Sequence, residues 1–240
     1  MSVPTPIELE LPGARVAFST RHGGVSDGPY RSLNLGILTD DERACVTENR
    51  RRLARALGLR PEAIAMGWQV HGSDLAEWAE PPAQEDYAEP TVPLRQVDGH
   101  LTDLPGVGLL VLVADCLPVA LAAPGRVAML HCGWRGLADG IVETAVARFE
   151  EPPAAAIGPG IGRCCYEVGD EVLAAFDGHP GVADGRTLDL RAVVRERLEA
   201  SGVRNIADVD LCTSCREDLF FSHRRDRGLT GRQGGLVWRT

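Results

Sequence analysis

The stretch of residues 107–136 constrains the fold most, because it contains two short apolar runs that each lead to a potential metal ligand or nucleophile. The first run, residues 107–114, leads to Cys116. The second run, residues 127–130, leads to His131. Aliphatic runs of this length, bounded by Gly or Pro, are typical of buried strands. Reactive side chains after strand ends are typical of a site on an α/β scaffold, so we expect both residues to be functional.

A third apolar run, residues 63–70, predicts another strand and leads to His71. Zinc binds thiolate and imidazole readily, and catalytic zinc sites use three protein ligands and keep one position open. His71, Cys116 and His131 meet that requirement if the three strand ends lie together. The spacing of these three residues matches no short zinc motif. The prediction of a zinc site therefore rests on their shared position after predicted strands.

The same residues also fit a second chemistry, in which Cys116 is a nucleophile. The imidazole of His131 would take the proton of the Cys116 thiol. A polar neighbour would orient that imidazole, and the candidates are Asp115, Asp98 and Asn34. Because both interpretations use the same pair, the sequence leaves them open.

One predicted amphipathic helix contains an unusual arginine. Thr39 and Glu42 have the spacing of a capping box at the start of this helix. Apolar residues then recur at helical spacing as far as Leu57, and Arg50 lies on the same apolar face. An unpaired buried charge is costly. Arg50 therefore extends past the apolar face, pairs with a core carboxylate, or binds an anion such as phosphate.

Strand and helix patterns alternate along the rest of the chain, with no linker-like stretch between two cores. The patterns predict strands at residues 16–19 and 154–157, and helices at residues 137–149, 170–176 and 190–200. Residues 20–34 form a Gly-rich candidate binding loop, and the acidic residues 79–95 are expected to be exposed. We therefore expect one α/β domain over residues 1–240.

Composition excludes several functional classes. The net charge of −9 argues against a nucleic-acid-binding protein. All 25 basic residues are Arg, which excludes lysine Schiff-base chemistry and a P-loop lysine. The sequence shows no secretory signal, and no apolar run approaches the roughly 18 residues of a membrane helix. We therefore expect a cytoplasmic protein that binds neither nucleic acid nor a membrane.

The other cysteines and histidines give weaker signals. Cys212 and Cys215 form a single C-x-x-C pair, which together with Cys164 and Cys165 is a weak indication of metal or redox function. Buried thiols otherwise behave as small hydrophobic groups, and all seven cysteines are expected to stay reduced. Three histidines fall in predicted loops and are expected to be solvated: His22, His100 and His179.

A set of short motifs, in order along nearly the whole chain, resembles the YfiH-like proteins. This family was long called the laccase-domain or multicopper polyphenol-oxidase family, and its members are now regarded as purine nucleoside phosphorylases. The motifs are TRHGGVS with SLNLG (20–36), ENR (48–50), QVHG (69–72), VDGHLTD (97–103), ADCLPV (114–119), HCGWRG (131–136), IGPGIGRCCYEVG (157–169), and FFSHRR with TGRQ (220–233). Cys132 and Gly160 depart from the residues more usual in the family, Ala and Ser, but neither belongs to the candidate triad.

The resemblance implies a Zn²⁺ site on His71, Cys116 and His131. It implies a layered α/β sandwich similar to that of the cytotoxic necrotising factor-like cysteine hydrolases. It further implies phosphorolysis of purine nucleosides such as adenosine, inosine, guanosine and 5′-methylthioadenosine, with adenosine deaminase activity. The expected partners are then a purine nucleoside and phosphate, with Arg50 holding phosphate and Asn34 contacting the sugar or phosphate.

Other functions are compatible with the same residues. A Cys–His amidase or deamidase, acting on a small molecule or a peptidoglycan precursor, would use Cys116 as its nucleophile. A copper-dependent phenol oxidase is disfavoured, because several copper centres need more histidine ligands than the six in this sequence supply. A non-enzymatic metal-binding role would give full zinc occupancy without turnover.

Overall fold

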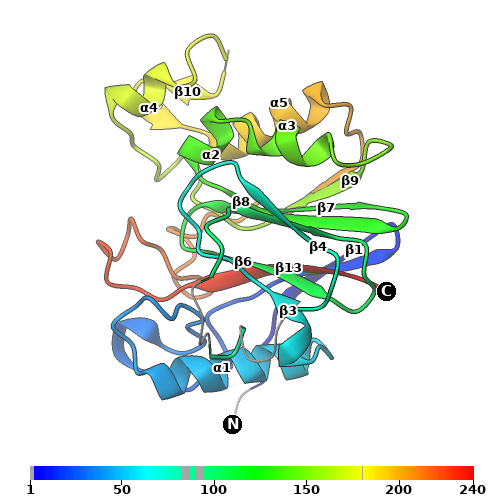
Figure 1. The fold of residues 1–240 in the computed structure, drawn as a ribbon. Helices are drawn as coiled ribbons and strands as arrows, with labels where there is room; N and C mark the ends of the chain where they lie inside the picture. The colour runs from blue at the N-terminus through cyan, green and yellow to red at the C-terminus, as the bar shows by residue number, and fades with distance from the viewer. Residues whose placement is uncertain (1–2, 83–86, 90–93, 180) are drawn as a thin grey trace.

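The computed structural model describes residues 3–82, 87–89, 94–179 and 181–240. Its elements lie in four layers (Figure 1). Helix α1 (Arg43–Ala56) covers the outer face of one sheet, and helices α2 (Trp134–Ala138), α3 (Ile141–Val146) and α5 (Leu190–Ala200) cover the outer face of a second sheet. The two sheets pack against each other. This mixed α/β arrangement agrees with the predicted layered sandwich.

The first sheet has five strands in the order β1-β2-β13-β6-β3. Their bounds are Ile7–Leu11 for β1, Ala14–Phe18 for β2, Gln233–Arg239 for β13, Gly108–Val113 for β6 and Ile64–Ala65 for β3. All neighbours are antiparallel except β3, which runs parallel to β6. Strands from both ends of the described chain thus lie in one sheet with β6, which comes from the central apolar run.

The second sheet has six strands in the order β12-β9-β7-β8-β5-β4. Their bounds are Ile206–Asp208 for β12, Ala154–Ile157 for β9, Leu117–Ala123 for β7, Arg126–Cys132 for β8, Gly99–Thr102 for β5 and Leu75–Trp78 for β4. The hairpin β7–β8 lies at its centre, and the outer pairs β12–β9 and β4–β5 are parallel. A short helix α4 (Asp170–Ala174) and the ribbon β10–β11 (Ala183–Asp184 and Thr187–Leu188) lie beyond α2.

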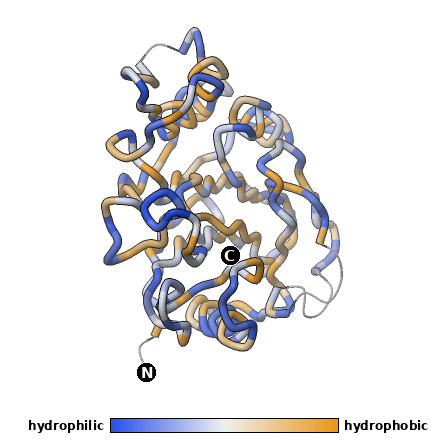
Figure 2. Tube along the Cα trace, turned by 90° about the vertical axis from the view of Figure 1, so that its left-hand side faces the viewer, coloured by the Kyte–Doolittle hydropathy of each residue, from blue (hydrophilic) through white to orange (hydrophobic). Residues whose placement is uncertain are grey.

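Side-chain alternation explains why both sheets are apolar on two faces. Along β7, Val119 and Leu121 face the helices, whereas Ala120 and Ala122 face the other sheet. Successive side chains of a strand point to opposite faces, so a strand buried on both sides is a continuous apolar run. Figure 2 shows the hydrophobic residues gathered along these inner strands.

The pattern-based predictions of several elements are confirmed. The structure has β2, β6, β8 and β9 at the four predicted strands around residues 16–19, 107–114, 127–130 and 154–157, and α5 covers residues 190–200. Helix α4 ends two residues before the predicted position. Among the described residues, no helix is long and apolar enough to cross a membrane.

Other predictions about elements are wrong. The strand expected over residues 63–70 is reduced to Ile64–Ala65, because only these residues pair with β6. The helix expected over residues 137–149 is split at Asp139-Gly140 into α2 and α3. The capping box is also absent, since the Thr39 hydroxyl donates to the Gly36 carbonyl at 2.7 Å and α1 begins at Arg43.

Two expectations of solvent exposure are wrong as well. Tyr87, in the acidic segment expected to be exposed, is only 1% exposed and packs beneath α1. His100 lies on β5 rather than in a loop, is fully buried, and accepts a hydrogen bond from Trp78 Nε1 at Nδ1. Burial lowers the pKa of His100 to about 4, so this imidazole is neutral. Residues 83–86 and 90–93 of the acidic segment lie outside the described residues.

The contact between the two sheets predicts the effect of one substitution. A Cβ at Gly235 on β13 would lie 2.5 Å from Pro118 Cβ on β7. Gly235→Ala must push the sheets apart, so we expect a loss of about 1–3 kcal/mol in the free energy of unfolding. Chemical denaturation measures it. Gly169→Ala is the control, because a Cβ there meets nothing within 4 Å, and an equal effect of both substitutions would contradict the packing explanation.

Candidate metal centre

Three residues predicted from strand ends converge at one edge of the two sheets. The ligand atoms of His71, Cys116 and His131 all lie within 4.8 Å of one another. Cys116 occupies the connection between β6 and β7, where the chain passes from one sheet to the other. His131 lies within β8 rather than after it, and His71 lies in the loop that precedes β4. The structure therefore brings the predicted triad together.

The buried carboxylate of Asp98 positions both histidines. It accepts backbone N–H groups from Val70, His71 and Gly72 at 3.0, 2.9 and 2.8 Å. Its Oδ1 also lies 2.7 Å from Nδ1 of His131. Burial by itself raises the pKa of Asp98, but the hydrogen bonds from His131 and the backbone lower it below its ordinary value. Of the three candidates for orienting the imidazole, the structure selects Asp98.

The charge distribution favours a thiolate at Cys116. Burial by itself raises the pKa of Cys116, but the charge and hydrogen bonds of His131 and His71 lower it to about 6. Burial likewise lowers the pKa of His131, whereas the Cys116 thiolate and the Asp98 carboxylate raise it to about 9. The pair is therefore a thiolate beside an imidazolium when no other cation is bound.

The donor set fits a transition-metal ion. One thiolate and two imidazoles are ligands that zinc and copper both accept. The carboxylate of Asp98 holds the Nδ1 proton of His131, which leaves Nε2 for a ligand, as is usual for metal-binding histidines. His131 is buried, Cys116 is half-buried and His71 is exposed, so the triad is open on one side. That openness is typical of catalytic rather than structural sites.

The open side of the triad faces a cavity of about 520 Å³, a volume suited to a small-molecule ligand. The cavity wall includes apolar and aromatic side chains, among them Leu38, Trp68, Leu112, Trp134, Ile161 and Tyr166. It also includes three cationic side chains, Arg135, Arg224 and Arg232, and the imidazole of His223. The combination suits a ligand with both a flat apolar group and negative charge.

The three arginines of this wall are held by contacts that leave the cavity cationic. The Arg135 guanidinium lies 4.4 Å from the centre of the Trp134 ring, and that of Arg224 lies 5.3 Å from the Tyr166 ring. Arg232 donates to the carbonyls of Thr230 and Gly231 at 3.1 and 2.9 Å. Since carbonyls and aromatic rings do not neutralise a guanidinium, the charges of Arg224 and Arg232 remain for a ligand. Arg135 also lies 4.0 Å from a carboxylate oxygen of Glu171, but this ion pair is exposed and therefore weak.

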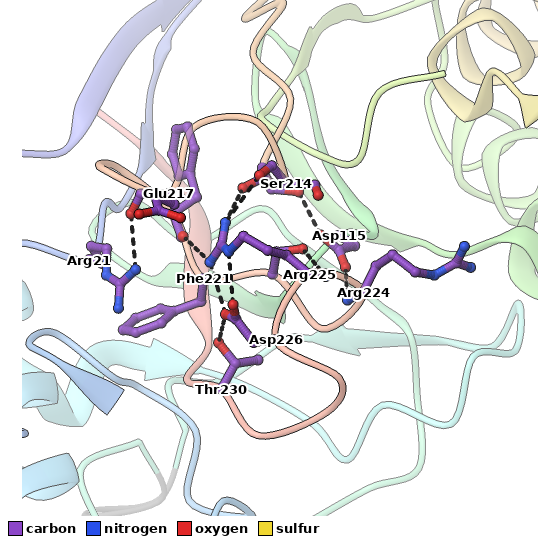
Figure 3. Close-up of polar contacts among 12 residues, drawn as sticks. Arg21, Asp115, Ser214, Glu217, Phe221, Arg224, Arg225, Asp226 and Thr230 are labelled. Atoms are coloured by element: carbon purple, nitrogen blue, oxygen red, sulfur yellow. Dashed lines mark hydrogen bonds and ion pairs between the residues drawn. The ribbon is translucent and has the colours of Figure 1, made fainter. Parts of the chain in front are cut away.

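The carboxylate of Asp115, beside Cys116, holds neighbouring segments together rather than orienting the His131 imidazole. Its two oxygens accept hydrogen bonds from the Thr213 hydroxyl and the Arg224 backbone N–H, both at 2.7 Å. Figure 3 shows the Arg224 side chain extending away from Asp115, and the neighbouring Arg225 tying the same loop to Ser214 and Asp226. Arg225 also donates to the Phe220 carbonyl at 3.1 Å. This network fixes the loop that carries Arg224.

The other two predicted site residues lie one layer behind the cavity wall. Arg50 is fully buried, and its guanidinium donates to the carbonyls of Leu35 and Tyr87 and touches Met66 of the wall. Asn34 is fully buried too, and its Oδ1 accepts the backbone N–H of Arg232 at 2.8 Å. The structure does not place either side chain against the cavity.

Sequence reasoning missed the three arginines that line the cavity. Arg135 lies in the HCGWRG motif, Arg224 in FFSHRR and Arg232 in TGRQ. These motifs contributed to the resemblance, but loop residues lack the periodicity that made Arg50 conspicuous. Their presence in the matching motifs was the only available signal.

Comparisons with known proteins identify the family of this chain. The model of the family described as multi-copper polyphenol oxidoreductase laccase matches residues 15–240. Purine nucleoside phosphorylase YlmD of Geobacillus stearothermophilus is 39% identical over 251 residues, which cover 95% of this chain and 90% of YlmD. Purine nucleoside phosphorylase YfiH of Escherichia coli is 38% identical over 239 residues, which cover 94% of each protein.

Solved structures show the same fold. The crystal structure of YlmD from Geobacillus stearothermophilus has a TM-score of 0.89 at 39% identity, and covers 95% of this chain and 93% of that one. The crystal structure of the Bacillus licheniformis hypothetical protein YfiH has a TM-score of 0.88 at 33% identity, with the same coverage. The chain therefore belongs to the multi-copper polyphenol oxidoreductase laccase family, as its resemblance to the YfiH-like proteins predicted.

Proposed function

We propose that this protein is a zinc-dependent purine nucleoside phosphorylase that also deaminates adenosine. Its substrates would be adenosine, inosine, guanosine and 5′-methylthioadenosine, with phosphate as the second substrate. The observation that carries the proposal is a His–Cys–His triad opening into a cavity lined by aromatic and cationic side chains. Relatives named purine nucleoside phosphorylase support the same substrate class.

The aromatic and the cationic side chains of the cavity suit the two substrates. Trp68 is 44% exposed, and its indole offers a flat surface on which a purine can stack. Arg135, Arg224 and Arg232 supply N–H donors and positive charge, which suit the oxygens of phosphate. A nucleoside bound on the aromatic side chains would then have its ribose between the base site and the phosphate site.

Phosphorolysis breaks the bond between ribose C1′ and the purine nitrogen, and forms a bond from a phosphate oxygen to C1′. The base leaves with the electron pair, so positive charge develops on the ribose and negative charge on the base. The arginines would hold phosphate against C1′, which supplies proximity and orientation. The triad would hold zinc, which contributes Lewis-acid chemistry when bound.

Asn34 and Arg50 keep a role in this proposal through the residues they contact. Asn34 holds the backbone of Arg232, and Arg50 supports Met66 and the segment at Leu35. We therefore propose that Asn34 and Arg50 position the segments that would bind phosphate, and do not contact phosphate themselves.

Cys116 is expected to be needed for both zinc binding and activity. Cys116→Ala removes the only sulfur donor of the triad, so we expect loss of one equivalent of bound zinc and loss of adenine release from adenosine plus phosphate. Metal analysis and chromatographic separation of adenine, inosine and hypoxanthine measure both effects. Cys45→Ala on α1 is the control, because its thiol lies outside the triad.

The result has three informative alternatives. A zinc-loaded wild-type protein that forms none of the three products would reject the enzymatic proposal. Copper in place of zinc would reject the metal assignment. Activity lost by Cys116→Ala without the loss of one equivalent of zinc would make Cys116 a nucleophile rather than a ligand.

Arg224 is expected to contribute to phosphate binding. Arg224→Ala should raise the phosphate KM by roughly 10- to 100-fold, as expected for losing hydrogen bonds to a charged group worth about 1.5–3 kcal/mol. The nucleoside KM should change far less. Steady-state kinetics with each substrate varied separately test this, and Arg148→Ala, whose side chain is 53% exposed and outside the cavity, is the control. An unchanged phosphate KM would remove Arg224 from the phosphate site.

A Cys–His amidase or deamidase is the second candidate function. It is favoured because the His131 imidazole interacts with both the Cys116 sulfur and the Asp98 carboxylate. Kinship with the cytotoxic necrotising factor-like cysteine hydrolases remains a prediction from the resemblance. Inhibition by thiol alkylation but not by chelators would support this function over phosphorolysis.

The thiolate at Cys116 predicts a pH dependence in metal-free protein. Alkylation requires the thiolate, whose fraction rises as pH increases through the pKa. Because the pKa of Cys116 is lowered to about 6, its alkylation rate should reach half-maximum near that pH. Cys45 is the internal control, since burial and Glu42 raise its pKa above the ordinary value. Peptide mass spectrometry resolves the two sites, and equal midpoints would contradict the predicted ion pair.

A further inference from the structure

A second group of thiols lies outside the triad. Cys164, Cys165, Cys212 and Cys215 have their sulfur atoms all within 4.8 Å of one another. Cys164 and Cys215 are exposed, and the other two are half-buried, so the group lies at the surface. The reaction proposed above uses none of these residues.

The fold itself brings these distant segments together. Strands β9 and β12 are parallel neighbours, so the loops that follow them leave from the same edge of the sheet. Pairing continues beyond the strands, because Thr213 N–H donates to the Gly160 carbonyl at 3.0 Å and Gly160 N–H donates to the Leu211 carbonyl at 3.3 Å. The four thiols therefore lie on a paired backbone rather than on two independent loops.

The distances suit a metal ion better than a disulfide. Cys215 Sγ lies 3.5 Å from Cys164 Sγ and 3.4 Å from Cys165 Sγ. A disulfide needs about 2.05 Å between sulfurs. Four sulfurs at about 2.3 Å from a tetrahedral zinc ion lie about 3.8 Å apart. That spacing is close to these two distances and within the 4.8 Å that bounds all separations in the group.

The backbone at Gly162 is shaped for a thiolate. Its N–H donates to Cys212 Sγ at 3.2 Å, the kind of hydrogen bond that stabilises a metal-bound sulfur. A Cβ at Gly162 would lie 3.2 Å from Cys164 Sγ and 3.4 Å from Cys212 Sγ, so a side chain there would crowd both sulfurs. Glycine allows the backbone to approach the group closely.

We propose that Cys164, Cys165, Cys212 and Cys215 bind a structural Zn²⁺ ion, separate from the ion proposed for the triad. Thiolate ligands select zinc among the common divalent ions, and a complete set of four protein ligands is typical of structural zinc. The inference does not depend on the proposed enzymatic function.

This ion would link two segments that support the cavity wall. Cys165 directly precedes Tyr166, which lines the cavity. Cys212 and Cys215 flank Thr213, whose hydroxyl holds Asp115 beside Cys116. Zinc at the four cysteines would therefore stabilise the loop network in Figure 3 and, through it, the loop that carries Arg224.

The test uses the full chain with the triad disabled. Cys116→Ala, purified under reducing conditions with zinc and then desalted, is expected to retain one zinc ion per chain by elemental analysis. Adding Cys215→Ser, a change at an exposed position, should remove that ion and lower the melting temperature. Adding Cys45→Ser instead should change neither quantity.

Cobalt(II) provides a second measurement on folded protein. In Cys116→Ala, cobalt should give the thiolate charge-transfer and visible absorption of a tetrahedral four-sulfur site, and Cys215→Ser should weaken both. Cys116→Ala that binds neither metal while remaining folded would overturn the proposal, as would a disulfide within the four cysteines of the reduced, zinc-treated protein. Because these readouts need no substrate, they stand even if the protein proves inactive on nucleosides.

Discussion

The candidate site depends on the buried carboxylate of Asp98. A buried charge is tolerated only when donors surround it, and this carboxylate accepts three backbone N–H groups and faces the His131 imidazole. The backbone of Asp98 also pairs with His131, because its carbonyl accepts the His131 N–H at 2.7 Å. One residue thus joins the loop of His71 to strand β8 and sets the orientation of the His131 imidazole.

The crossing from β6 to β7 supplies the third member of the triad. Since these consecutive strands belong to different sheets, the turn that carries Cys116 opens at the edge of the sandwich rather than in its core. Loops from the C-terminal half then close around that edge and contribute Arg224 and Arg232. A protein with a net charge of −9 thereby acquires a locally cationic cavity, which overall composition cannot reveal.

The sequence by itself determined the α/β class and singled out the three residues of the candidate triad, and its resemblance to the YfiH-like proteins implied the layered sandwich. Strands buried on both faces, such as β6 and β9, are continuous apolar runs, and α5 has clear helical periodicity. Reactive residues after three apolar runs singled out His71, Cys116 and His131, although His71 lies in a loop and His131 lies within β8 rather than after it. Each of these signals depends on residues close together in the sequence, so one short segment is enough to recognise it.

Only the tertiary structure decided which charged residues face the cavity. Arg50 has the pattern of an anion-binding residue, yet folding turns it toward backbone carbonyls. Arg224 lies in a loop without periodicity, and its position depends on a hydrogen bond to Asp115, 109 residues earlier in the chain. The strand expected over residues 63–70 was likewise shortened by the limited pairing that β6 offers. Long-range hydrogen bonds and strand pairing leave no periodic trace in sequence, whereas burial does.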